Sequence, residues 1–206
     1  MPAKYLTSVA PVLLMAACQS VPRQDDSLAF EFAIVGDGPS VDYNEPKYDR
    51  MIEVINARQQ LQWVIHVGDL KGGGQSCDDA MLRARYDLNQ RFQFPFILTP
   101  GDNDWFDCSG ASAGGYDPYE RLDFLRELFY PNAQLTTGHN PIPVISQADD
   151  PQYGEFVENV RWTHNGIVFA TLHLVALNPG SSETPRDAKR MNAALAWARQ
   201  AFQEAE

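Results

Sequence analysis

Three acidic side chains follow three apolar segments in the first half of the chain, each directly after a glycine. Asp37 closes FAIVGD, Asp69 closes WVIHVGD, and Asp102 lies in FPFILTPGDND. Such segments are typical of buried parallel strands, whose carboxyl ends meet at one edge of a sheet. Gly-Asp is also ordinary turn chemistry after a strand, because glycine permits positive φ and aspartate caps a following helix. Three such turns in succession favour a common site.

Carboxylates that converge in this way indicate a metal centre. Carboxylates packed a few ångströms apart cannot all stay ionised unless protons or cations neutralise them. Hard oxygen ligands suit divalent ions such as Mg²⁺, Mn²⁺ or Fe²⁺, and a site for two ions favours an acid that both ions share. We therefore predict that Asp37, Asp69 and Asp102 lie together and bind metal.

The elements that must position these acids can be predicted from hydrophobic periodicity and from turn signals. Strands are expected at 28–35, 63–67 and 94–99, helices at 46–61, 78–92, 118–130 and 185–206, and a hairpin at 156–162 and 167–177. Alternation of strand and helix predicts parallel pairing in the first part, whereas the Asn165-Gly166 turn predicts antiparallel strands later. The fold class is therefore α/β with mixed pairing.

Length and charge limit the classes of function. A chain of 206 residues with 44% apolar residues is long enough for one domain with a sizeable core. Its net charge of −11 repels nucleic-acid backbones and anionic lipid head groups. We therefore expect no nucleic-acid partner. A small phosphate ester remains possible as a substrate, because bound cations would attract it locally.

The first residues are typical of an export signal. Lys4 precedes an apolar stretch at 9–17 that is too short to span a bilayer, so 1–18 is predicted to be a signal peptide. The sequence LMAAC, which ends at Cys18, resembles a bacterial lipobox, although Met15 stands where leucine is preferred. We expect lipidation of Cys18, a polar tether at 19–27 and a lipoprotein of the periplasm or outer membrane. Plain secretion is the alternative.

Two cysteines remain once Cys18 is used for lipid. Cys77 and Cys108 both follow segments that carry the acids, and an exported pair is a candidate disulfide. Closing a loop of about thirty residues would stabilise the fold by about 3 to 4 kcal/mol on the chain-entropy model. Two free thiols are the alternative.

The order and even spacing of the acidic motifs resemble the calcineurin-like metallophosphoesterases over 28–206. The motifs that carry the resemblance are Asp37, Gly68-Asp69 and Gly101-Asp102-Asn103-Asp104. The resemblance implies a four-layer α/β/β/α sandwich with mixed sheets, here incomplete at its C-terminal end. It also implies two divalent ions, chosen among Mn, Mg, Fe and Zn, and hydrolysis of a phosphate ester at the bacterial cell envelope.

The resemblance also implies roles for single residues. Asp37 would bind the first metal, Asp69 would bridge both metals and serve catalysis, and Asp102 would bind the second metal where the family has Asn. Asn103 stands at the position of the family's catalytic histidine, and Pro39 stands where a histidine ligand is expected. Because an amide does not titrate near neutral pH, Asn103 can donate a hydrogen bond to a phosphoryl oxygen but cannot act as a general acid.

The family's distal histidine ligands have no clear counterpart. His66 and His173 both lie inside expected strands, where a packed histidine is more common than a ligand, and no Gly-His-x-His occurs before Glu206. The last helical pattern also reaches Glu206 without a stop signal, so we expect the natural protein to be longer. Two hypotheses follow. One is a phosphoesterase whose remaining ligands lie further along, and the other is a degenerate, non-catalytic relative that binds metal or a phosphorylated ligand.

Overall fold

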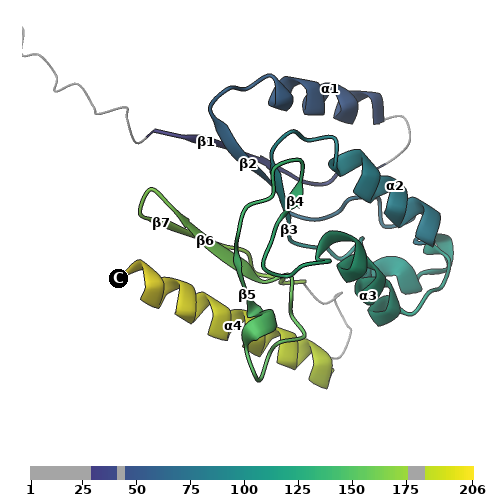
Figure 1. Cartoon of the computed structure of the whole chain (residues 1–206). Coiled ribbons are helices and arrows are strands. Elements are labelled where there is room, and N and C mark those ends of the chain that lie inside the picture. Colours follow the sequence, from purple (N-terminus) through teal and green to yellow (C-terminus); the bar gives the residue numbers. More distant parts are fainter. Residues whose placement is uncertain (1–28, 41–44, 176–183) are drawn as a thin grey trace, which may run out of the picture.

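A computed structural model describes residues 29–40, 45–175 and 184–206 of the chain. The predicted signal peptide at 1–18, including Cys18, and the predicted tether at 19–27 lie outside the described residues. Figure 1 shows a mixed arrangement of helices and strands, which agrees with the expected α/β class. Within the described ranges, no helix combines the length and the apolar character that a membrane span requires.

The first sheet brings the ends of the three acid-bearing segments to one edge. Its strand order is β1-β2-β3-β4. The strands are β1 (Glu31–Val35), β2 (Leu61–His66), β3 (Pro95–Leu98) and β4 (Thr137–Gly138). β1, β2 and β3 pair in parallel, and β4 pairs antiparallel to β3. Because parallel strands end on the same side, the loops after β1, β2 and β3 are neighbours.

The helices begin where side chains can satisfy their free N–H groups. The helices are α1 (Glu45–Asn56), α2 (Asp79–Asn89), α3 (Pro118–Phe129) and α4 (Pro185–Ala205). Asp78 caps α2 and Asp117 caps α3 through hydrogen bonds from backbone N–H groups of the first turn. Thr184 forms a capping box with Asp187 at the start of α4.

Two hydrophobic clusters hold the layers together. One cluster packs α1, α2 and α3 on one face of the first sheet, with Ile52, Leu82 and Leu125 among its members. The other joins the opposite face, through Trp63 and Ile97, to a second sheet. That sheet has the order β5-β6-β7 and comprises β5 (Ile145–Ser146), β6 (Val160–His164) and β7 (Ile167–Ala170).

The helix α4 covers the second sheet on the side away from the first. Arg161 of β6 lies over the ring of buried Trp197, at 4.2 Å from its centroid, and Gln147 donates to the carbonyl of Ala193 at 2.9 Å. Figure 1 shows α1, α2 and α3 on one side of the two sheets and α4 on the other.

The hairpin differs from expectation in its bounds. Its first strand was expected at 156–162 and forms at 160–164, and the second ends at Ala170 instead of continuing toward 177. Beyond Ala170, hydrogen bonds to side chains replace the regular backbone hydrogen bonds between strands. The Thr171 hydroxyl accepts from the Val160 N–H at 3.0 Å, and Asn159 Oδ1 accepts from the His173 N–H at 2.7 Å. The short strands β4 and β5 were not predicted.

The expected disulfide is present. Cys77 and Cys108 are bonded, with their Cα atoms 5.6 Å apart, and both residues are fully buried. The bond joins the segment before α2 to the segment after β3, so it fixes two of the loops that follow the strands of the first sheet.

We expect the double variant Cys77→Ala/Cys108→Ala to lose about 3 to 4 kcal/mol of unfolding free energy, because the unfolded chain is no longer constrained. Urea denaturation measures this loss. As a control, a thiol reductant should destabilise the native chain to a similar degree and leave the double variant unchanged. Equal unfolding free energies of the double variant and of the native chain without reductant would contradict the expectation.

Candidate functional site

Backbone hydrogen bonds hold the first two acid-bearing loops side by side. The N–H of Asp37 donates to the carbonyl of Gly68 at 3.1 Å, and that of Val67 donates to Val35 at 2.8 Å. The third loop joins them where the N–H of Thr99 donates to the carbonyl of His66 at 2.9 Å. Asp37, Asp69 and the loop of Asp102 therefore leave the sheet at one edge.

Two of the predicted acids adopt an unusual backbone conformation. Asp37 has φ 55° and Asp69 has φ 59°, both in the left-handed region. Within the described part of the chain, Asn165 in the hairpin turn is the other non-glycine residue with positive φ. Such residues cost about 1 to 3 kcal/mol each and concentrate at functional sites. This left-handed conformation makes the backbone turn at both aspartates, shortly after the ends of β1 and β2.

Two glycines allow the loops to approach closely. Gly68 has φ 95°, and a Cβ atom there would lie 2.2 Å from the backbone nitrogen of Gly101. A Cβ atom at Gly101 would lie 2.1 Å from Oδ1 of Asp69. Larger residues at either position would push the second and third loops apart, so both glycines of the Gly-Asp motifs are needed for contact.

Asp69 lies at the centre of the acidic group. Burial is the largest cause of the rise in the pKa of Asp69 to about 6. The charges of Asp102 and Asp37 contribute to this rise, whereas a hydrogen bond from the backbone N–H of Asn103 opposes it. That N–H lies 3.3 Å from Asp69 Oδ1 and 3.0 Å from Asp102 Oδ1. Asp69 and Asp102 are therefore in contact, and Asp37 is near enough to act on Asp69.

A fourth acid, Asp104, holds the loops in place. It is fully buried, and its Oδ2 accepts from the N–H groups of Asp69 at 2.9 Å and Gly101 at 2.8 Å. Its Oδ1 accepts from the N–H of Leu70 at 2.7 Å. Burial raises the pKa of Asp104 to about 7, although these hydrogen bonds favour its ionised form. The sequence analysis assigned no role to this residue.

Lys71 and Asp107 extend the cluster, and the sequence analysis missed both. Lys71 is fully buried, and its Nζ donates to the carbonyls of Gly72 and Gln75, both at 3.3 Å. Burial lowers the pKa of Lys71, whereas the charges of Asp104, Asp107 and Asp69 oppose this shift. Burial also raises the pKa of Asp107, and Asp102 adds to the rise. Lys71 therefore supplies positive charge among these acids.

The glycine run after Lys71 was the signal that could have revealed this arrangement. A Cβ atom at Gly72 would lie 2.5 Å from the carbonyl oxygen of Ser40, and one at Gly73 would lie 2.8 Å from Oδ1 of Asn103. The run thus passes between the loop after β1 and the loop after β3. Residues with side chains could not fit there without displacing Asn103.

His66 and His173 are packed residues, as expected. His66 Nδ1 accepts from the Gly68 N–H at 3.1 Å, and its Nε2 lies 3.4 Å from the Gly38 carbonyl. Burial lowers the pKa of His66 to about 4, so the ring is neutral at pH 7. His173 lies between Glu158, 2.6 Å from Nδ1, and Trp105, whose Nε1–H donates to Nε2 at 3.2 Å. Both rings have both nitrogens engaged, which leaves none to bind a metal.

The donor atoms present are of the kind that a hard divalent cation prefers, but their side chains are not arranged to hold one. Asp37, Asp69 and Asp102 offer carboxylate oxygens at one edge, where repulsion favours a bound cation. Over the described ranges, however, no group of three or more His, Cys, Asp or Glu side chains is placed so that it could hold a metal ion. Asp69 and Asp102 instead both accept from the N–H of Asn103. Metal binding therefore requires these side chains to rotate.

The variant Asp104→Ala is expected to lose about 3 to 5 kcal/mol of unfolding free energy, because three backbone N–H groups, that of buried Leu70 among them, lose their acceptor. Thermal or urea denaturation measures the loss. The matched control is Asp102→Ala in the same loop. It should change stability by less than about 1 kcal/mol or increase it, because it removes repulsion at a partly exposed site. A stable Asp104→Ala variant would show that the loops are held by other contacts.

Comparisons with protein-family models, with curated proteins and with solved structures found no match in any of the three. The function is therefore inferred from the residues of the site.

Proposed function

We propose that the chain is a metal-dependent phosphoesterase that hydrolyses a phosphate ester at the bacterial cell envelope. The observation that carries this proposal is the meeting of Asp69 with Asp102 and Asp37, with Asp37 and Asp69 both on left-handed backbone. A fold that places strained, like-charged side chains together loses stability there, and such positions are typical of functional sites.

The layer order supports the finer assignment of the fold. Helices α1 to α3, the two sheets and α4 follow one another in the order that the resemblance to the calcineurin-like metallophosphoesterases implies. We propose a four-layer α/β/β/α sandwich with mixed sheets on this basis. The parallel strands β1, β2 and β3 carry the acidic motifs at the edge where this arrangement requires them.

Asp37, Asp69 and Asp102 would hold the metal, with Asp69 shared if two ions bind. Bound divalent ions would supply a nucleophilic water and neutralise charge on the phosphoryl oxygens. Carboxylate donors without imidazole favour Mg²⁺ or Mn²⁺ over Zn²⁺. The chain itself contributes the Asn103 amide as a hydrogen-bond donor for a phosphoryl oxygen, while the buried Asp104 keeps the loops at their spacing.

The second candidate is a non-catalytic relative that binds metal or a phosphorylated ligand. Asn103 occupies the position where the resemblance places a catalytic histidine, and an amide cannot transfer a proton at neutral pH. His66 and His173 have both ring nitrogens engaged and cannot replace it without rearrangement. These observations favour binding without turnover.

Hydrolysis of a generic phosphomonoester in the presence of Mn²⁺ or Mg²⁺ distinguishes the two candidates. We expect slow turnover by the chain and a loss of at least about a hundredfold in kcat/KM for Asp69→Asn. The control is Asp87→Asn, an exposed aspartate of α2 outside the acidic group, which should retain full activity.

Three outcomes decide between the candidates. Metal binding without hydrolysis of the phosphomonoester supports the non-catalytic relative. Neither binding nor hydrolysis overturns both proposals. Full activity of Asp69→Asn would show that the acidic group is not the site of the reaction.

A further inference from the structure

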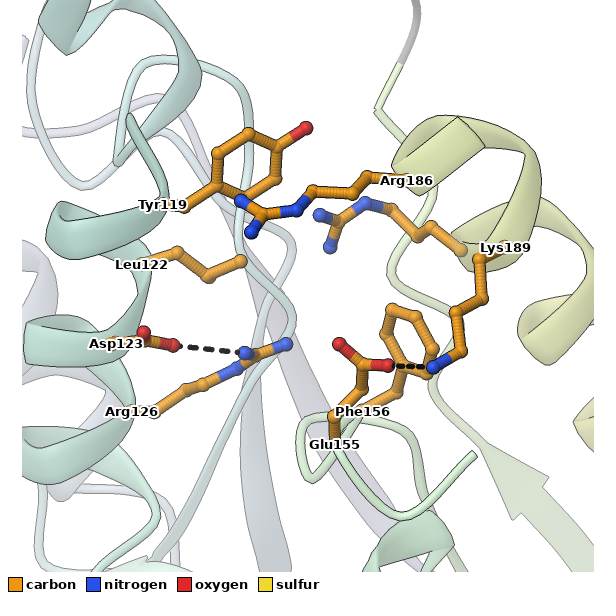
Figure 2. Close-up of a pocket in the computed structure, with 9 residues that line it drawn as sticks. Tyr119, Leu122, Asp123, Arg126, Glu155, Phe156, Arg186 and Lys189 are labelled. Carbon is orange, nitrogen blue, oxygen red and sulfur yellow. Dashed lines mark hydrogen bonds and ion pairs between the residues drawn. The ribbon is translucent and has the colours of Figure 1, made fainter. Parts of the chain in front are cut away.

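A cavity rich in arginine lies between α3 and α4, away from the acidic group. Its volume is about 140 Å³, and none of Asp37, Asp69 and Asp102 lines it. Figure 2 shows Arg126 reaching into it from α3, Arg186 and Lys189 from α4, and Glu155 with Phe156 from the segment between. Arg190 of α4 lines it as well. This concentration of positive charge stands out in a chain with a net charge of −11.

Most of the cations in this cavity already have carboxylate partners. Arg126 donates to buried Glu158 through Nε at 3.0 Å and Nη2 at 2.8 Å. Burial alone would raise the pKa of Glu158, but hydrogen bonds from His173 and Arg126 hold it at about 2, so Glu158 is ionised. Lys189 forms a salt bridge with Glu155. Arg190 shares Glu158 with Arg126 as a salt-bridge partner, and Arg186 remains to be accounted for.

Arg190 is buried, and its salt-bridge partner Glu158 also pairs with Arg126. The exposed fraction of Arg190 is 6%, and its guanidinium lies 4.4 Å from the centroid of the Trp105 ring. The nearest carboxylate oxygen, on Glu158, is 3.7 Å away, beyond hydrogen-bond distance. His173 Nδ1 is closer, at 3.0 Å.

His173 cannot accept a hydrogen bond from the guanidinium of Arg190. Its Nε2 accepts the N–H of Trp105, so in the neutral ring the proton is on Nδ1 and is donated to Glu158. Within the described part of the chain, the charge of Arg190 is therefore balanced by the salt bridge to Glu158, which Arg126 shares. Buried polar groups are usually hydrogen-bonded, so the N–H groups of this guanidinium are suited to a further acceptor.

Arg186 adds a second positive charge at the mouth of the cavity. Its guanidinium lies 4.3 Å from the centroid of the Tyr119 ring, which orients it. Over the residues described, no carboxylate accepts a hydrogen bond from it. Because Arg186 is exposed, leaving its charge unpaired costs little free energy, and its guanidinium is free to bind a ligand. Arg186 and Arg190 together offer two charges and a set of directed donors.

We propose that this cavity binds a small dianionic oxyanion of the phosphate or sulfate class. A cavity of about 140 Å³ has room for an ion of this size. Planar guanidinium groups match oxyanions through paired N–H···O hydrogen bonds. Among the residues described, four cationic side chains meet three carboxylates, Asp123, Glu155 and Glu158, which leaves a net positive charge that favours an anion. An oxyanion with four oxygens can accept from both Arg186 and Arg190, which favours it over a simple carboxylate. The proposal does not depend on the phosphoesterase proposal, because it concerns a separate cavity.

Calorimetric titration with inorganic phosphate tests the proposal, in EDTA so that the acidic group carries no metal and repels phosphate. We expect one site per chain that is weakened about tenfold or more in Arg186→Gln, because a charge-assisted contact is lost. The matched control is Arg199→Gln, an exposed arginine of the same helix that does not line the cavity, and its affinity should equal that of the native chain. Asp69→Asn should also bind phosphate unchanged.

Arg190→Gln should weaken binding further, and because it changes a buried group, its fold is checked by circular dichroism. Parallel titrations use sulfate and acetate. Sulfate and phosphate should both bind more tightly than acetate, and the tighter of the two identifies the preferred ion. Absence of phosphate binding, equal affinity in Arg186→Gln, or acetate binding as tight as phosphate would each overturn the proposal.

Discussion

The acidic edge of this protein depends on one buried carboxylate. Asp104 accepts hydrogen bonds from the backbone of Asp69, Leu70 and Gly101, so it joins the loop after β2 to the loop after β3. Without it, three backbone N–H groups, that of buried Leu70 among them, would lack an acceptor, and the left-handed turn at Asp69 would lose its support. The contact between Asp69 and Asp102 follows from this anchoring, because the two loops can approach only while they are held at this spacing.

Charge is distributed unevenly over the molecule, and Trp105 lies between the two regions. On one side, Asp69, Asp102 and Asp107 gather with Lys71 as a buried cation. On the other side, the guanidinium of Arg190 lies against the Trp105 ring. A cation would complete the first region and an anion the second. Each region concentrates charge of one sign beyond what its own side chains neutralise, which is typical of sites that bind charged ligands.

Much of the fold could be predicted from the sequence, but the partners within the site could not. The apolar segments before Asp37, Asp69 and Asp102 predicted the parallel strands, and Pro118 predicted the start of α3. Periodicity and turn residues are local signals, so they suffice for such elements. The roles of Asp104, Lys71 and Asp107 depend on which loops pack together, and β4 and β5 are too short to show a pattern. The burial of Arg190 likewise depends on Trp105, which is distant in sequence.

The most direct test of the central claim, that Asp69 lies at the centre of a divalent metal site, is a Mn²⁺ titration followed by electron paramagnetic resonance. The free-ion signal should fall on addition of the native chain, and Asp69→Asn should weaken binding by about tenfold or more, because a charged ligand becomes a neutral one. Asp87→Asn, which lies outside the site, should bind like the native chain. Equal Mn²⁺ affinity in Asp69→Asn and the native chain would contradict the account.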